Sequence, residues 1–206
     1  MASDVVALMR QLGHDRFAVV GHDRGSLVAF RTAMDHPEAV TRLVVMDGLP
    51  VVEHLERLNE AFVRGWWHWW FLGQTDKPAE RVINLDPDAW YRTPSAEEMG
   101  PENHADVWTA LRTPAVVHGM CEDYRAGLTI DRAAEEADRA AGRRVACPML
   151  LLAATEDDID IHGDPVEIWR PWVAGELRSR PIHSGHHQAE QAPGELTDAL
   201  ADFLAR

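Results

Sequence analysis

Cysteine is scarce in this sequence, with only Cys121 and Cys147 and no C-x-x-C pair. This scarcity excludes a disulfide framework and indicates reduced thiols in a cytoplasmic protein. Basic residues are outnumbered, with 20 Lys and Arg against 34 Asp and Glu, so the formal net charge is −14. Such a charge makes nucleic acid and an anionic membrane surface unsuitable partners. The sequence also lacks an apolar run of the ~18 residues that a membrane span needs, and it lacks the basic and apolar segments of a signal peptide.

Short apolar runs alternate with helical patterns in the first fifty residues. Residues 4–12 and 25–34 repeat apolar positions at helical spacing, while residues 17–20 and 43–46 are short, apolar and rich in β-branched side chains. Runs of this kind are typical of buried strands. The order helix, strand, helix, strand therefore predicts a parallel sheet with helices on its faces.

The pattern changes after residue 50 and returns near residue 147. Residues 51–139 show Trp-rich and Ala/Glu-rich helical patterns without a convincing strand, whereas "CPMLLLAAT" and "LRSRPIH" again indicate strands, each followed by a helix. We expect an α/β fold with a parallel sheet of about four strands. Residues 1–50 and 140–206 would form its core, and residues 51–139 an inserted helical cap.

The first strand ends in the pentapeptide "GHDRG", residues 21–25. In a strand–turn–helix corner of the form G-x-[nucleophile]-x-G, the turn residue is exposed and the glycines let the backbone pass. The helix that follows directs its free N–H groups at the same place. Here the turn residue is Asp23, and a carboxylate in that position can displace a leaving group from carbon and form an ester to the enzyme. An acid in a turn is also common without any catalytic role.

A nucleophile of this kind needs a base and an acid that orients the base. Where the nucleophile stands at such a corner, the usual chain order is nucleophile, acid, histidine. The segment "IHSGHHQAEQAP" places His186 directly after Gly185, with His187 as its rival and His183 nearer the strand end. Two acids follow strands, Asp47 and Asp157, and from the residues alone both remain open as the orienting acid. An acid at a strand end can also simply cap the next helix.

Several segments, taken in order, resemble the α/β-hydrolase fold and, within it, the fluoroacetate dehalogenases. They are "FAVVGHDRG", "DHPEAVTRLVVMD", "HWWFLGQ", "DPDAWY", "MCEDYRAG" and "SGHHQAEQAP". The resemblance implies a hydrolase of carbon–halogen bonds that forms an aspartyl ester, with a small-molecule substrate and no cofactor. It also implies further strands ahead of the strand–turn–helix corner at Asp23. We therefore expect a chain that corresponds to the C-terminal part of the fold.

The resemblance assigns roles residue by residue. Asp23 matches the nucleophile, His186 the general base and Asp47 the orienting acid, and Arg24 matches one of two arginines that hold a substrate carboxylate. Three residues of the cap match donors to the departing halide: His68, Trp69 and Tyr124. The pattern departs from the family at Leu27, which stands where the second arginine is expected. A larger or more apolar substrate than a small haloacid follows as a hypothesis.

Three alternatives remain. An epoxide hydrolase would use the same nucleophile with tyrosines as proton donors, and Tyr91 and Tyr124 are the two tyrosines in the chain. A catalytically inactive remnant would act as an interaction module through the exposed edge of its first strand, and such an edge also predicts a homo-oligomer or strand-edge association. A metal site is the weakest alternative, because the histidines lack an H-x-x-x-H or H-E-x-x-H spacing; we predict none.

Overall fold

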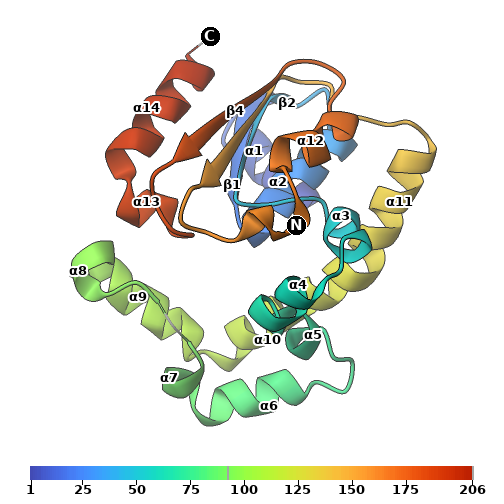
Figure 1. Cartoon of the computed structure of the whole chain (residues 1–206). Helices are drawn as coiled ribbons and strands as arrows, with labels where there is room; N and C mark the ends of the chain where they lie inside the picture. Colours follow the sequence, from blue (N-terminus) through green and yellow to red (C-terminus); the bar gives the residue numbers. More distant parts are fainter. Residues whose placement is uncertain (92, 206) are drawn as a thin grey trace. The chain divides into compact units, whose positions relative to one another are not determined.

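The computed structural model describes residues 1–91 and 93–205, which form two compact units (Figure 1). The first unit comprises Met1–Arg57 and Glu135–Arg206, and the second Leu58–Ala134. The sequence-based division placed residues 51–139 in the insertion. The structure instead assigns residues 51–57 and 135–139 of that range to the first unit. The elements of the first unit are α1 (Ala2–Gln11), β1 (Phe17–His22), α2 (Arg24–Asp35), β2 (Val40–Met46), α3 (Val51–Glu56), α11 (Arg132–Ala140, which spans the boundary), β3 (Met149–Ala154), η2 (Ile159–His162), α12 (Pro165–Trp169), η3 (Arg170–Trp172), β4 (Leu177–Ile182), α13 (Gln188–Gln191) and α14 (Pro193–Leu204).

The first unit contains a parallel sheet of four strands in the order β1-β2-β3-β4. This confirms the predicted sheet, and each predicted strand overlaps an observed one. Because the strands are parallel and adjacent in chain order, their carboxyl ends lie at the same edge, and residues directly after them are brought together there.

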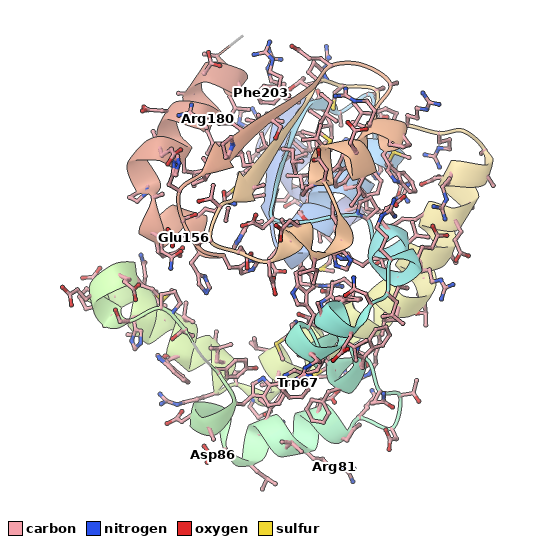
Figure 2. All side chains as sticks on the ribbon, viewed as in Figure 1. Trp67, Arg81, Asp86, Glu156, Arg180 and Phe203 are labelled. Carbon is pink, nitrogen blue, oxygen red and sulfur yellow. The ribbon has the colours of Figure 1, made fainter. Side chains whose placement is uncertain are left out.

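Alternate residues of the strands enter two different hydrophobic clusters. Leu43 and Val45 pack with α1, α2, α12 and η3, whereas Val44 and Met46 pack with α14. The sheet is therefore covered on both faces, as Figure 1 shows. This is the arrangement that near-continuous apolar strands require. Phe203 of α14, labelled in Figure 2, is 3% exposed and belongs to the second cluster.

Helices α3 and α11 are tied to one another within the first unit. Glu135 accepts the backbone N–H of Val52 at 2.8 Å, which satisfies a free donor at the start of α3. Arg139 donates to both carboxylate oxygens of Glu56, with Nη1 to Oε2 at 2.8 Å. The chain segments that lead into and out of the second unit are thus held together.

A buried histidine pair lies between α3 and η2. Nδ1 of His54 and Nε2 of His162 are 2.9 Å apart, and the two residues are 2% and 7% exposed. Burial and mutual repulsion, together with the nearby Arg24, keep the pKa of His54 well below its usual range despite the opposing charge of Asp23. Burial also lowers the pKa of His162 to about 4.

We expect this pair to make the first unit sensitive to acid. Since both pKa values are lowered on folding, the stability they contribute is present above pH 6.5 and is lost as pH falls toward about 4. The loss should reach about 3 kcal/mol for His162 alone. The double variant His54→Asn/His162→Gln keeps amide groups near the facing nitrogens and should flatten the stability profile over that window, as measured by urea unfolding at several pH values. Replacing the exposed His14 by Gln should leave the profile unchanged, and an equally steep profile in the double variant would contradict the prediction.

The second unit is helical throughout its described residues. Its buried centre includes Phe62, Trp69 and Tyr124, and the ring of Phe62 packs edge-on against Trp66, Trp69 and Trp70. Its elements, besides the start of α11, are α4 (Glu60–Gly65), α5 (His68–Leu72), α6 (Pro78–Leu85), α7 (Pro87–Trp90), α8 (Ala96–Met99), α9 (Pro101–Leu111), α10 (Pro114–Ala126) and the π-helix η1 (Gly127–Asp131).

A salt bridge fastens α6 to α10 in this second unit. Arg125 donates to both oxygens of Glu80 at 2.7 and 2.8 Å and also to the carbonyl of Gln74 at 2.8 Å. This bidentate pair lowers the pKa of Glu80 to about 2. The pair thus holds α6 and α10 together within the second unit.

None of the helices in the described residues has both the length and the apolar character that crossing a membrane would require.

Candidate active site

Asp23 occupies the sharp corner between β1 and α2. Its backbone has φ 51° and ψ −123°, a conformation that side-chain-bearing residues rarely adopt. The corner is closed by Ser26, whose N–H and Oγ both donate to the Asp23 carbonyl at 2.9 and 2.6 Å. Strain of this kind persists only where the surroundings hold it, and it is typical of functional corners.

Two glycines are required for this corner to form. A Cβ added at Gly21 would lie 2.2 Å from the carbonyl oxygen of Gly25. A Cβ at Gly48 would lie 1.8 Å from Oγ of Ser26, the residue that closes the turn. The first is one of the two glycines of the sequence motif, and its role is close approach of β1 to the start of α2. The other, Gly25, does not have the predicted steric role, because a Cβ there would meet nothing within 4 Å.

His186 lies between Asp23 and Asp157. Its Nδ1 donates to Oδ2 of Asp157 at 2.7 Å, and its Nε2 is 3.9 Å from Oδ1 of Asp23. Asp157 belongs to the loop after β3, beside Glu156, which Figure 2 labels, and His186 belongs to the loop after β4. Each residue thus follows a different parallel strand, which is how three distant segments reach one place.

The charges of this group reinforce one another. The hydrogen bond to Asp157, followed by the nearby negative charge of Asp23, raises the pKa of His186 to about 10. Desolvation raises the pKa of Asp23 and of Asp157, but their contacts with His186 outweigh it, so both pKa values are lowered. The backbone N–H of Arg24, at the start of α2, also lowers the pKa of Asp23. At neutral pH the resting group therefore consists of two carboxylates and one imidazolium.

Asp47 does not make the contact that the sequence reasoning assigned to it. That reasoning favoured Asp47 over Asp157 as the partner of His186, whereas the hydrogen bond of Nδ1 goes to Asp157. Each oxygen of Asp47 instead accepts from another buried donor. Oδ1 accepts the N–H of Ala154 at 2.8 Å, and Oδ2 accepts from Nε2 of Gln188 at 2.7 Å. Burial raises the pKa of Asp47, and Asp157 raises it further.

His22, between Gly21 and Asp23, packs against the base. Its ring centroid is 4.7 Å from that of His186, and its buried Nε2 has no hydrogen-bond partner among the described residues. His187 also packs against His186, with ring centroids 5.7 Å apart. The hydrogen bond between Nδ1 and Asp157 nevertheless distinguishes His186 from His187, the other candidate for the base. Sequence reasoning gave His22 no role.

Among the residues that the structure describes, two groups of side chains hold potential metal-ligand atoms within 4.8 Å of one another. They are His22, Asp47 and His186 in the first unit, and Glu80, His118 and Glu122 in the second. In the first group Asp47 already accepts two hydrogen bonds, and in the second Glu80 is paired with Arg125. Neither group offers a full set of open ligands, so we assign no metal to either.

The three predicted halide-binding residues cluster within the second unit. The ring of Tyr124 lies edge-on to those of His68 and Trp69, with centroids 5.8 and 6.0 Å apart. Trp69 is 4% and Tyr124 is 7% exposed. The structure therefore brings together side chains from α5 and α10 that the sequence separates by more than fifty positions.

Of the predicted residues in the first unit, Arg24 and Leu27 lie in the first turn of α2 and Asp23 immediately precedes it. Gln188, which contacts Asp47, was missed. It follows the base by two residues, and no sequence signal separates it from an ordinary polar residue at the start of a short helix.

Comparison with known proteins agrees with this architecture. The sequence profile described as the alpha/beta hydrolase fold matches residues 1–193. Fluoroacetate dehalogenase from Burkholderia sp is 36% identical over 212 residues, which cover 100% of this chain and 69% of that protein. Soluble epoxide hydrolase from Corynebacterium sp. (strain C12) is 25% identical over 215 residues, covering 100% of this chain and 72% of that protein.

A solved structure described as "a putative epoxide hydrolase from Pseudomonas aeruginosa" superposes with a TM-score of 0.91 at 37% identity, covering 99% of this chain and 70% of that one. Together with the matched family profile and the strand–turn–helix corner, these likenesses give one conclusion. The chain belongs to the α/β-hydrolase family.

Proposed function

We propose that this chain is a hydrolase of the haloacetate dehalogenase type, which cleaves a carbon–halogen bond through an ester of Asp23. The observation that carries the proposal is the arrangement of His186, hydrogen-bonded to Asp157 and 3.9 Å from an oxygen of Asp23, which stands at the strained corner. A carboxylate there suits displacement at an alkyl carbon, because it forms an ester and needs no proton removed beforehand.

The proposed reaction has two steps. In the first, an Asp23 oxygen attacks the carbon that carries the halogen, a C–O bond forms, and the halide leaves with the electron pair of the C–X bond. In the second, His186 Nε2 takes a proton from water while the water oxygen adds to the Asp23 carboxyl carbon. The alkyl oxygen then leaves as an alcohol, and Asp23 is restored as a carboxylate.

The charge of Asp23 links the two steps. While Asp23 is a carboxylate, it helps to raise the pKa of His186 to about 10, so the imidazole carries a proton. Ester formation removes that negative charge, and with it one of the two contacts that raise the pKa of His186, so the imidazole holds its proton less strongly. The proposed order is that His186 acts as the base after the ester has formed, when the second step needs it.

Two features address the substrate. The family resemblance assigns the N–H and O–H groups of His68, Trp69 and Tyr124 to a departing halide. Arg24 beside the nucleophile would hold an anionic group, but Leu27 removes the second cation of the family pattern. Loss of one charge-assisted contact costs about 1.5–3 kcal/mol. We therefore propose a larger or more apolar organohalogen as a better substrate than fluoroacetate.

An epoxide hydrolase is the second candidate, favoured by the likeness to the Corynebacterium enzyme and to the Pseudomonas structure. Such an enzyme needs a tyrosine O–H to protonate the alkoxide. The ring of Tyr124 lies edge-on to Trp69, and the O–H of Tyr91 contacts the sulfur of Met120, one helical turn before Tyr124 on α10, at 3.6 Å. The pairing of His68 with Trp69 in sequence is what favours a halide over an epoxide.

A single turnover in H₂¹⁸O tests the ester, and halide release tests the bond that is cleaved. With fluoroacetate, a neutral haloalkane and an epoxide supplied in parallel, the neutral haloalkane should give the fastest product formation. In the first turnover the alcohol should carry ¹⁶O from the protein, and the peptide that contains Asp23 should gain ¹⁸O. Incorporation of ¹⁸O into the first product would exclude the ester, and a strong preference for fluoroacetate would exclude the apolar-substrate proposal.

A further inference from the structure

We propose that Gln188 is a positioning residue that occupies Asp47 and thereby leaves Asp157 as the carboxylate that orients His186. This inference rests on the proposed function only in its catalytic readout. Two carboxylates follow adjacent strands beside one imidazole, and His186 Nδ1 can donate to one of them. Some feature of the site must therefore select Asp157 over Asp47 as the acceptor.

Asp47 is near enough to compete with Asp157 for the hydrogen bond from His186. An oxygen of Asp47 lies within 4.8 Å of a ring nitrogen of His186. Asp47 is 3% exposed, so solvent cannot replace a partner that it loses. A buried carboxylate without enough donors accepts from whatever N–H lies in reach.

Gln188 removes that tendency. It is 0% exposed, and Nε2 donates to Oδ2 of Asp47 at 2.7 Å. With Ala154 N–H on Oδ1, each oxygen of Asp47 already has a donor. By contrast, the side chain of Asp157 is 17% exposed and accepts Nδ1 of His186 at 2.7 Å.

The Gln188 side chain, which we call the clamp because it donates to Asp47, lies in the same short segment as the base, His186. The N–H of Gln188 donates to the carbonyl of His186 at 3.1 Å, so the two residues are fixed relative to one another. Any shift of this loop that moved His186 toward Asp47 would also have to displace the Gln188 amide. The remaining amide oxygen of Gln188, Oε1, is buried without a hydrogen-bond partner among the described residues. The amide thus contributes at this site as a donor to Asp47.

The test is a rescue. Asp157→Asn should lower kcat by ~10²–10⁴-fold, the range seen when the acid that orients a catalytic histidine becomes an amide. Adding Gln188→Met removes the donor from Asp47 and frees that carboxylate to accept from His186, so the double variant should recover at least about tenfold. Gln191→Met changes an exposed glutamine of the same helix and should give no recovery. A recovery equal to that control, or a larger loss from Asp47→Asn than from Asp157→Asn, would overturn the proposal.

A second measurement separates this inference from the proposed reaction. The pKa of His186, followed by NMR titration of ¹⁵N-histidine-labelled protein, should fall from about 10 in Asp157→Asn and rise again when Gln188→Met is added. This readout requires no substrate, so it still tests the clamp if no organohalogen is turned over. A pKa that Asp157→Asn leaves unchanged would show that Asp157 is not the partner. In the same spectra, the dispersion of the other histidine signals would confirm that each variant is folded.

Discussion

Replacing His186 with glutamine should stop the proposed reaction after its first step and leave Asp23 esterified. The nucleophile remains, so one equivalent of halide should be released, whereas steady turnover should fall by at least about 10³-fold because no base activates water. Intact-protein mass spectrometry should then show a stable mass increase equal to the alkyl group of the substrate. Peptide mapping should locate that increase on the segment that contains Asp23.

Two variants serve as controls for this trapping experiment. Asp23→Asn should give neither the burst of halide nor the mass increase. His187→Gln changes the neighbouring histidine, whose pKa is lowered chiefly by burial, and should retain turnover. Accumulation of the ester in His187→Gln instead of His186→Gln would show that the roles of the two histidines are reversed.

Removing the carboxylate of Asp138 should strongly destabilise the first unit. Its side chain is 4% exposed and accepts from Arg31 Nη1 at 2.7 Å and from Arg143 Nη1 at 2.6 Å. Asp138→Ala removes the buried partner of Arg31, whose side chain is 15% exposed, and breaking a buried pair typically costs 3–5 kcal/mol. We expect a loss of about 3 kcal/mol in the free energy of unfolding, measured by urea denaturation followed by circular dichroism.

Asp35→Ala is the matched control for this stability measurement. Asp35 accepts from Nη2 of the same Arg31 at 2.7 Å, but its side chain is 43% exposed. Water can therefore replace the lost contact, and the cost should stay below about 1 kcal/mol. Equal losses in the two variants would mean that burial of Asp138 does not govern the strength of the pair.

The sequence was sufficient to predict the sheet and the corner because both depend on local patterns. Apolar, β-branched runs such as "LVVM" have few alternatives to a buried strand, and Gly21 two residues before Asp23 is what a strand–turn–helix corner requires sterically. The gathering of Asp23, Asp47, Asp157 and His186 then follows from parallel strand order alone.

The choice between Asp47 and Asp157 could not be predicted in the same way. Both acids follow neighbouring strands, so topology brings both to His186, and the decision depends on the hydrogen bonds that each oxygen already makes. Those bonds involve Gln188 and the backbone of Ala154, whose alignment depends on strand register and loop geometry. The resemblance to a family favoured Asp47 on position and could not account for a polar clamp.

The pinning of α3 to α11 has a consequence for how the chain could be re-engineered. Because Glu56 is bonded to Arg139 and Glu135 caps α3, the two junctions of the insertion are set within the first unit by its own contacts. An insertion whose ends are anchored in this way is a favourable site for exchange, since a replacement only has to span a fixed gap. Residues 58–134 therefore form a natural cassette, and helical segments from related hydrolases could be grafted between Arg57 and Glu135 without rebuilding the sheet.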